Sequence, residues 1–75
     1  MKSNEFIEIF KDTIQSDSEI EMDSPLADIE EWDSMAMMAL IAYFDVKLDI
    51  TVTFDQLHAL SSVGDVAQLI PGFEA

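Results

Sequence analysis

Residues 33–48 read DSMAMMALIAYFDVKL and carry the strongest helical pattern in the chain. Their large apolar residues recur at offsets of three, four, seven and eleven positions, which is the spacing of one face of an α-helix. These residues are Met37, Leu40, Ile41, Phe44 and Leu48. Asp33 or Ser34 can cap the helix start, because a short polar side chain accepts a hydrogen bond from the first free backbone N–H groups. We therefore predict a long helix that begins at Asp33-Ser34.

The residues before this helix divide into a shorter helix and a long loop. From about Ser3 to Ile14, Phe6, Phe10 and Ile14 form one apolar stripe, and Ser3 can cap the start. From Gln15 to Asp33 the helical period disappears. A loop longer than roughly 15 residues in a small domain tends to be functional. We expect scattered apolar residues to anchor it, namely Ile20, Met22, Leu26, Ile29 and Trp32.

The residues after Leu48 predict an extended connection and two more helices. Residues 49–52 are β-branched in part but have no evident pairing partner, so we interpret them as a connection. A short helix from Phe54 to Leu60 follows, with Phe54 and Leu57 facing inward. Residues 62–65 read SVGD, which resembles a capping box with Asp in place of Glu, and the last helix then runs to Pro71-Gly72.

The predicted fold class is therefore all-α: a four-helix bundle with a long first loop and a short third helix. Its core is expected to contain Phe6, Phe10, Ile14, Leu40, Ile41, Phe44, Leu48, Leu57, Val66 and Ile70. Seventy-five residues allow one compact domain, so residues 1–75 are expected to form a single domain.

Charge and composition exclude several classes of function. Sixteen acids against three lysines give a net charge of −13, which would repel nucleic acid and anionic membranes and attract basic protein surfaces. Half of the residues are nevertheless apolar (49%), so the chain is not a disordered acidic tail. It has no cysteine and no apolar run long enough to be a signal peptide or a membrane span, so we expect a cytoplasmic protein.

Residues for conventional catalysis or metal binding are scarce. His58 is the only histidine, and a triad of His58, Ser34 and some acid can be drawn in any acidic protein with one histidine, so it carries no weight. Asp17, Glu19, Glu21 and Asp23 alternate in the loop but lack the central glycine and the closing glutamate of a calcium-binding EF-hand. We interpret them as a solvated charge run, and we expect neither catalytic nor metal-binding residues.

Ser34 stands at the junction between the long loop and the longest helix. Alone, Asp-Ser before an apolar helix is an ordinary helix cap. In this layout, however, Asp33-Ser34-Met35 resembles the Asp-Ser-Leu motif of the acyl carrier protein family, and the resemblance covers nearly the whole chain. It implies that Ser34 is the covalent attachment point of 4'-phosphopantetheine. It also implies that Asp33 helps to engage the phosphopantetheinyl transferase and its magnesium, and that Met35 contacts partners.

Two positions depart from the family's pattern. Carriers usually have glycine two residues before the serine, where this chain has Trp32, which we expect to pack inward because a large ring usually seeks burial. Family members also place acids on the exposed face of the second helix. Here we place on that face Ala36, Met38, Ala39 and Ala42, with the next acid only at Asp45. Docking is therefore expected to use Met35, Met38, Ala39 and Ala42, with Met38 alternatively at the edge of the core.

The resemblance implies a carrier without catalytic activity of its own, which holds an acyl or aminoacyl group as a thioester. Its partners would be the transferase, a loading ligase and downstream transferases of a specialised pathway. We expect a monomer that binds no nucleic acid and does not insert into membranes. The alternative function is a small acidic helical interaction module, a binder of basic surfaces or a nucleic-acid mimic, that needs no prosthetic group.

Overall fold

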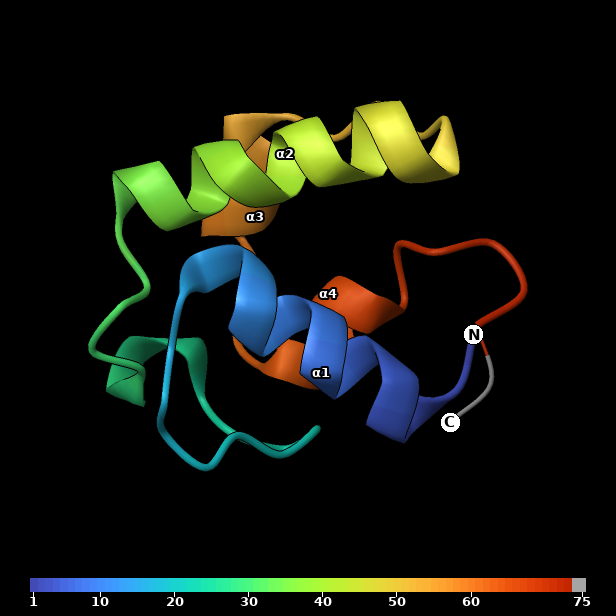
Figure 1. Ribbon diagram of the computed structural model, residues 1–75. Coiled ribbons are helices and arrows are strands. Elements are labelled where there is room, and N and C mark those ends of the chain that lie inside the picture. The colour runs from blue at the N-terminus through green and yellow to red at the C-terminus, as the bar shows by residue number, and fades with distance from the viewer. Residues whose placement is uncertain (74–75) are drawn as a thin grey trace.

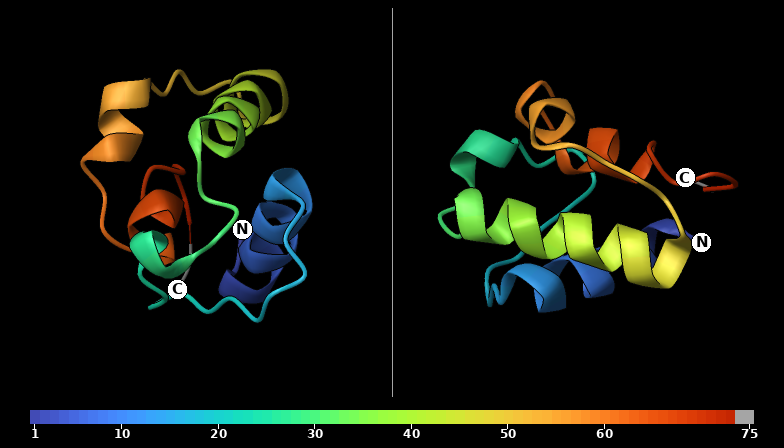
Figure 2. Two further views of the ribbon diagram at one scale, coloured as in Figure 1. Left: turned by 90° about the vertical axis from the view of Figure 1, so that its left-hand side faces the viewer. Right: turned by 90° about the horizontal axis from the view of Figure 1, so that it is seen from above.

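Four helices surround a common centre. A computed structural model describes residues 1–73 and contains α1 (Ser3–Ile14), a 3₁₀ turn η1 (Leu26–Asp28), α2 (Ser34–Leu48), α3 (Phe54–His58) and α4 (Val63–Ala67). Figure 1 shows α2 lying across the molecule above α1 and α4. Viewed from the end of α2, the four helices lie around one central space (Figure 2). Residues 1–73 contain no β-strand, and one isolated bridge pairs Pro25 with Ser62. The all-α fold with a long first loop and a short third helix is therefore confirmed.

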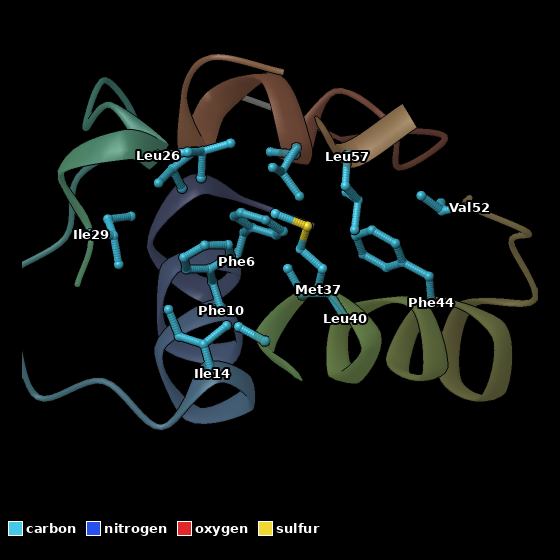
Figure 3. Close-up of a cluster of buried hydrophobic side chains, with 14 of the residues drawn as sticks. Phe6, Phe10, Ile14, Leu26, Ile29, Met37, Leu40, Phe44, Val52 and Leu57 are labelled. Carbon is cyan, nitrogen blue, oxygen red and sulfur yellow. The ribbon is translucent and has the colours of Figure 1, made fainter. Parts of the chain in front are cut away.

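The core draws on every helix and on the loop. Phe6 and Phe10 of α1, Leu40 and Phe44 of α2 and Leu57 of α3 are almost completely buried (Figure 3). Eight of the ten predicted core residues are buried: these five together with Ile14, Val66 and Ile70. The predicted loop anchors are also confirmed: three are buried and two pack against the core at partial exposure. The buried three are Ile20, Leu26 and Ile29, and the partly exposed two are Met22 and Trp32.

The buried face of α2 is rotated from the predicted one. Ile41 and Leu48, predicted to lie in the core, are only half-buried at its edge, whereas Ala36, predicted on the exposed face, is 5% exposed. The cause is the packing of α2 against α1, which turns the side of the helix that carries Ala36 inward. Ala39, on the same side, is half-buried, and Ala42 is exposed as predicted.

Three backbone hydrogen bonds hold the long loop to residues 61–64, at the start of α4. Leu26 N–H donates to the Ser61 carbonyl at 2.9 Å, and Val63 N–H donates to the Ser24 carbonyl at 3.1 Å. Gly64 N–H donates to the Met22 carbonyl at 2.7 Å. A side chain at Gly64 would bring its Cβ within 2.9 Å of that same carbonyl oxygen, so the close approach requires glycine.

Several helix ends differ from those predicted. Ser3 does not cap α1: it is already helical, and the extended residue before it is Lys2, which has no hydroxyl to offer. The last two helices end early, α3 at His58 and α4 at Ala67. Beyond Ala67 the N–H groups of residues 69 and 70 bond three residues back, so a tighter turn replaces the α-helix before Pro71.

Two helix starts are fixed by capping boxes. The predicted box at 62–65 is confirmed, because Ser62 Oγ accepts from Asp65 N–H at 3.2 Å and Asp65 Oδ2 accepts from Ser62 N–H at 3.2 Å. The same arrangement joins Thr53 and Gln56 at the start of α3, which the sequence analysis did not identify. Within the described residues, none of the helices is long and apolar enough to cross a membrane.

Candidate functional site

Ser34 is the first residue of α2 and is exposed to solvent. Asp33 precedes it in extended backbone, and its Oδ1 accepts a hydrogen bond from Ala36 N–H at 2.9 Å. Asp33 is therefore the helix cap, which leaves the Ser34 hydroxyl unused for capping. Met37 N–H donates to the Asp33 carbonyl at 3.0 Å, so the helical hydrogen bonding of α2 starts at Asp33 and includes Ser34 in the first turn.

The residues just before Ser34 are attached to α1. The Trp32 ring stacks on Phe10, with centroids 5.6 Å apart and planes at 26°, so its predicted inward packing is confirmed. Ser16 Oγ donates to Glu31 Oε1 at 3.0 Å and accepts from Ser18 N–H at 3.2 Å. Ser16 is 7% exposed, the one buried polar residue in the part of the chain that the structure describes. The end of the long loop is thus held at two adjacent positions before the serine.

An exposed apolar surface runs along the outer side of α2. Met35 is 79% exposed and Met38 is 60% exposed, so Met38 faces solvent and does not fill the core edge. Ala42 lies four residues after Met38. Val46, which is 74% exposed, lies four residues further and continues the same surface. Sequence reasoning missed Val46, although the four-residue step from Ala42 was a sufficient signal.

Two grooves flank this surface. The first, which we call the α1–α2 groove, has a volume of about 370 Å³ and lies between residues 13–15 at the end of α1 and Met35, Ala36 and Ala39 of α2. Glu31 and Asp33 also line it. The second, the α2–connection groove, has a volume of about 420 Å³. Its lining residues are Met38, Ile41, Ala42, Asp45, Thr51 and Val52. Of the predicted docking residues, Met35 and Ala39 therefore lie on one groove, and Met38 and Ala42 on the other.

The remaining candidates for chemistry stay apart. His58 is exposed at the end of α3, with its ring 5.4 Å from that of Phe54. Within residues 1–73 no three acidic, histidine or cysteine side chains are grouped so that they would hold a metal ion. The alternating acids of the loop, Asp17 to Asp23, are exposed, in agreement with a solvated charge run.

The start of α2 fits a covalently attached phosphodiester. The N–H groups of Ser34 and Met35 donate to no acceptor within the described residues, and the free N–H groups at a helix start favour an anion. No acidic residue occupies the first turn of α2 itself. The Ser34 hydroxyl is accessible to a modifying enzyme, and the residues just before it are held in place by the contacts described above.

Comparisons with known proteins agree with this geometry. No curated protein sequence matches the chain. A solved structure of "a putative acyl carrier protein" from Mycobacterium tuberculosis superimposes with a TM-score of 0.69, over 88% of this chain and 89% of that one, at 23% identity, a level at which the likeness concerns the fold. The phosphopantetheine attachment site family matches residues 4–70, which include α1 from its second residue, the other three helices and Asp33-Ser34-Met35. Proteins of this family carry 4'-phosphopantetheine and are carriers rather than enzymes. The chain belongs to the phosphopantetheine attachment site family.

Proposed function

We propose that Ser34 carries the phosphopantetheine arm and that the protein holds an acyl or aminoacyl group for partner enzymes. The observation that carries this proposal is the exposed hydroxyl of Ser34 at the start of the longest helix, with Asp33 occupied as the cap. The arm supplies a terminal thiol, which holds the cargo as a thioester. The chain itself supplies the attachment point, the free N–H groups beside it and the surface on which partners dock.

The partners in this proposal are a phosphopantetheinyl transferase, a loading ligase and downstream transferases. They would contact Met35, Met38, Ala39 and Ala42, and we add Val46 because it extends the same exposed surface. α2 carries no acid before Asp45, so this docking relies on apolar contacts more than on ion pairs. That chemistry favours partners of a specialised pathway with their own recognition surfaces.

The setting of the proposal is a single carrier domain, residues 1–75, acting as a monomer. We propose the cytoplasm as its compartment, because coenzyme A must be available as donor of the arm. Asp33 would present its carboxylate to the transferase from the position immediately before the hydroxyl.

Intact-mass measurement tests the attachment. The purified protein is incubated with coenzyme A, magnesium and a transferase of broad specificity. One phosphopantetheine-sized increment is expected for the wild type and for Ser18→Ala, a control at another exposed serine, and none for Ser34→Ala. No increment on the wild type would instead favour an interaction module without a prosthetic group.

A further inference from the structure

The two grooves beside α2 differ in chemistry, and the attachment serine adjoins one of them. Both sequence neighbours of Ser34, Asp33 and Met35, line the α1–α2 groove. The α2–connection groove begins at Met38, one helical turn further along. A group esterified to Ser34 would therefore start beside the α1–α2 groove.

We propose that the unloaded phosphopantetheine arm lies in the α1–α2 groove, an inference that rests on its attachment to Ser34. The arm offers two amide N–H groups and a hydroxyl as donors, with two geminal methyl groups near its phosphate end. A resting site for it therefore needs hydrogen-bond acceptors beside an apolar wall.

The α1–α2 groove offers both. Acceptors come from the carboxylates of Glu31 and Asp33, each of which has one oxygen without a hydrogen bond among the described residues, and from the Thr13 hydroxyl. The main-chain carbonyls of Thr13 and Ile14, at the free end of α1, accept no hydrogen bond from the described residues beyond the helix.

An apolar wall faces these acceptors. The methyl groups of Ala36 and Ala39 and the side chain of Met35 form it. Ala39 is half-buried and small, which leaves room beside α2 that a larger side chain would fill.

The α2–connection groove suits an arm less well. Four of its six lining residues are apolar, and its side-chain acceptors are only Asp45 and Thr51, at the end of α2 remote from Ser34 and on the connection that follows. An arm lying there would find fewer acceptors for its two amide N–H groups, and a donor that leaves water without gaining an acceptor costs free energy.

Nuclear magnetic resonance of the holo protein tests this placement. Isotope-labelled protein carrying an unlabelled arm is expected to show nuclear Overhauser contacts from the two arm methyl groups to the methyl of Ala39 or Met35. Relative to the apo protein, backbone shift changes are expected at Thr13 and Gln15 but not at Thr51. Contacts to Ala42 or Thr51 in their place, or no arm contacts at all, would overturn the inference.

Two variants sharpen the test. Ala39→Trp fills the α1–α2 groove and is expected to abolish the shift changes at Thr13 and Gln15, whereas Ala42→Trp, on the other groove, is expected to retain them. If Ala39→Trp fails to fold by circular dichroism, the contacts of the wild-type arm still decide. Intact mass is measured first: an unmodified protein refutes the proposed function, whereas a modified protein without groove contacts refutes only the resting site.

Discussion

Substitutions of Asp33 separate its structural role from its proposed role in recognition. Its Oδ1 accepts from Ala36 N–H at 2.9 Å, so Asp33→Ala removes a helix cap, at a cost of about 1 kcal/mol. The same change removes a negative charge at the helix start, worth roughly 0.3–1 kcal/mol. Asp33→Asn keeps the accepting oxygen and loses only the charge. Asp33→Ala is therefore expected to lose about 1–2 kcal/mol of stability and Asp33→Asn about 0.5 kcal/mol.

Two assays read these roles independently. Thermal unfolding reports the cap, because 1 kcal/mol corresponds to about 4–8 °C in a domain of this size. The rate of the coenzyme A–dependent mass increment reports recognition. A hydrogen bond to a charged group is worth about 1.5–3 kcal/mol, so both variants are expected to load about tenfold more slowly or worse.

Thr53→Ala is the matched control. Thr53 caps α3 through its Oγ1, which accepts from Gln56 N–H at 3.2 Å, so its loss costs about 1 kcal/mol without touching the start of α2. Thr53→Ala should lose about as much stability as the cap alone contributes to Asp33→Ala, and it should load like the wild type. Loading of Asp33→Asn at the wild-type rate would refute the role in recognition. Equal melting temperatures for Asp33→Asn and Asp33→Ala would show that the hydrogen-bonded cap is not the larger contribution of Asp33 to stability.

Three further substitutions test the fold and the docking surface. Gln15 ends α1 at φ 57°, so Gln15→Gly should raise the free energy of urea unfolding by about 0.5–1 kcal/mol, and a lower value would contradict the strain argument. Gly64→Ala should lower the free energy of urea unfolding by about 1–3 kcal/mol despite the better helix propensity of alanine, because the new Cβ would lie 2.9 Å from the Met22 carbonyl oxygen. Ala42→Gly measures the difference in helix propensity alone. If Gly64→Ala instead stabilises the protein, the loop at Met22 moves to make room for the methyl group. Met38→Glu should leave the melting temperature nearly unchanged while slowing transfer to a partner enzyme, and pronounced unfolding would show that Met38 supports the core.

Periodicity and capping predicted most of the fold because both are local. The stripe of Phe6, Phe10 and Ile14 identifies α1 with its observed bounds, and the Ser62–Asp65 box identifies the start of α4. Asp33-Ser34 predicted the start of α2 to within one residue, with Asp33 rather than Ser34 as the cap. In each case the chemistry that fixes the structure lies within one or two helical turns.

The features that were predicted wrongly or missed depend on contacts between segments that are distant in the sequence. The rotation of α2 toward Ala36 depends on how it packs against α1, and periodicity alone leaves the edge of a helix face undetermined by about one residue. The hydrogen bond from Ser16 to Glu31 joins residues 15 apart in a segment with no regular period, so nothing local indicates it. The early end of α4 likewise precedes the proline that local rules would hold responsible.

A loop of 19 residues before Ser34 would by itself leave that serine loosely placed. The structure avoids this by fixing the loop at two places. Met22–Leu26 bond to residues 61–64 at the start of α4, and near Ser34 the Trp32 ring stacks on Phe10 of α1 while Glu31 bonds to Ser16, just after α1. The Ser34 hydroxyl is therefore held in a fixed position. With the arm attached there, as proposed above, the reach of the carrier would come from the arm rather than from movement of the protein. Since a flexible tether raises the local concentration of its cargo only around its origin, a fixed origin beside an exposed docking surface lets each docked partner meet the cargo in the same place. The apolar surface from Met35 to Val46, which begins next to that origin, is where such docking would be most effective.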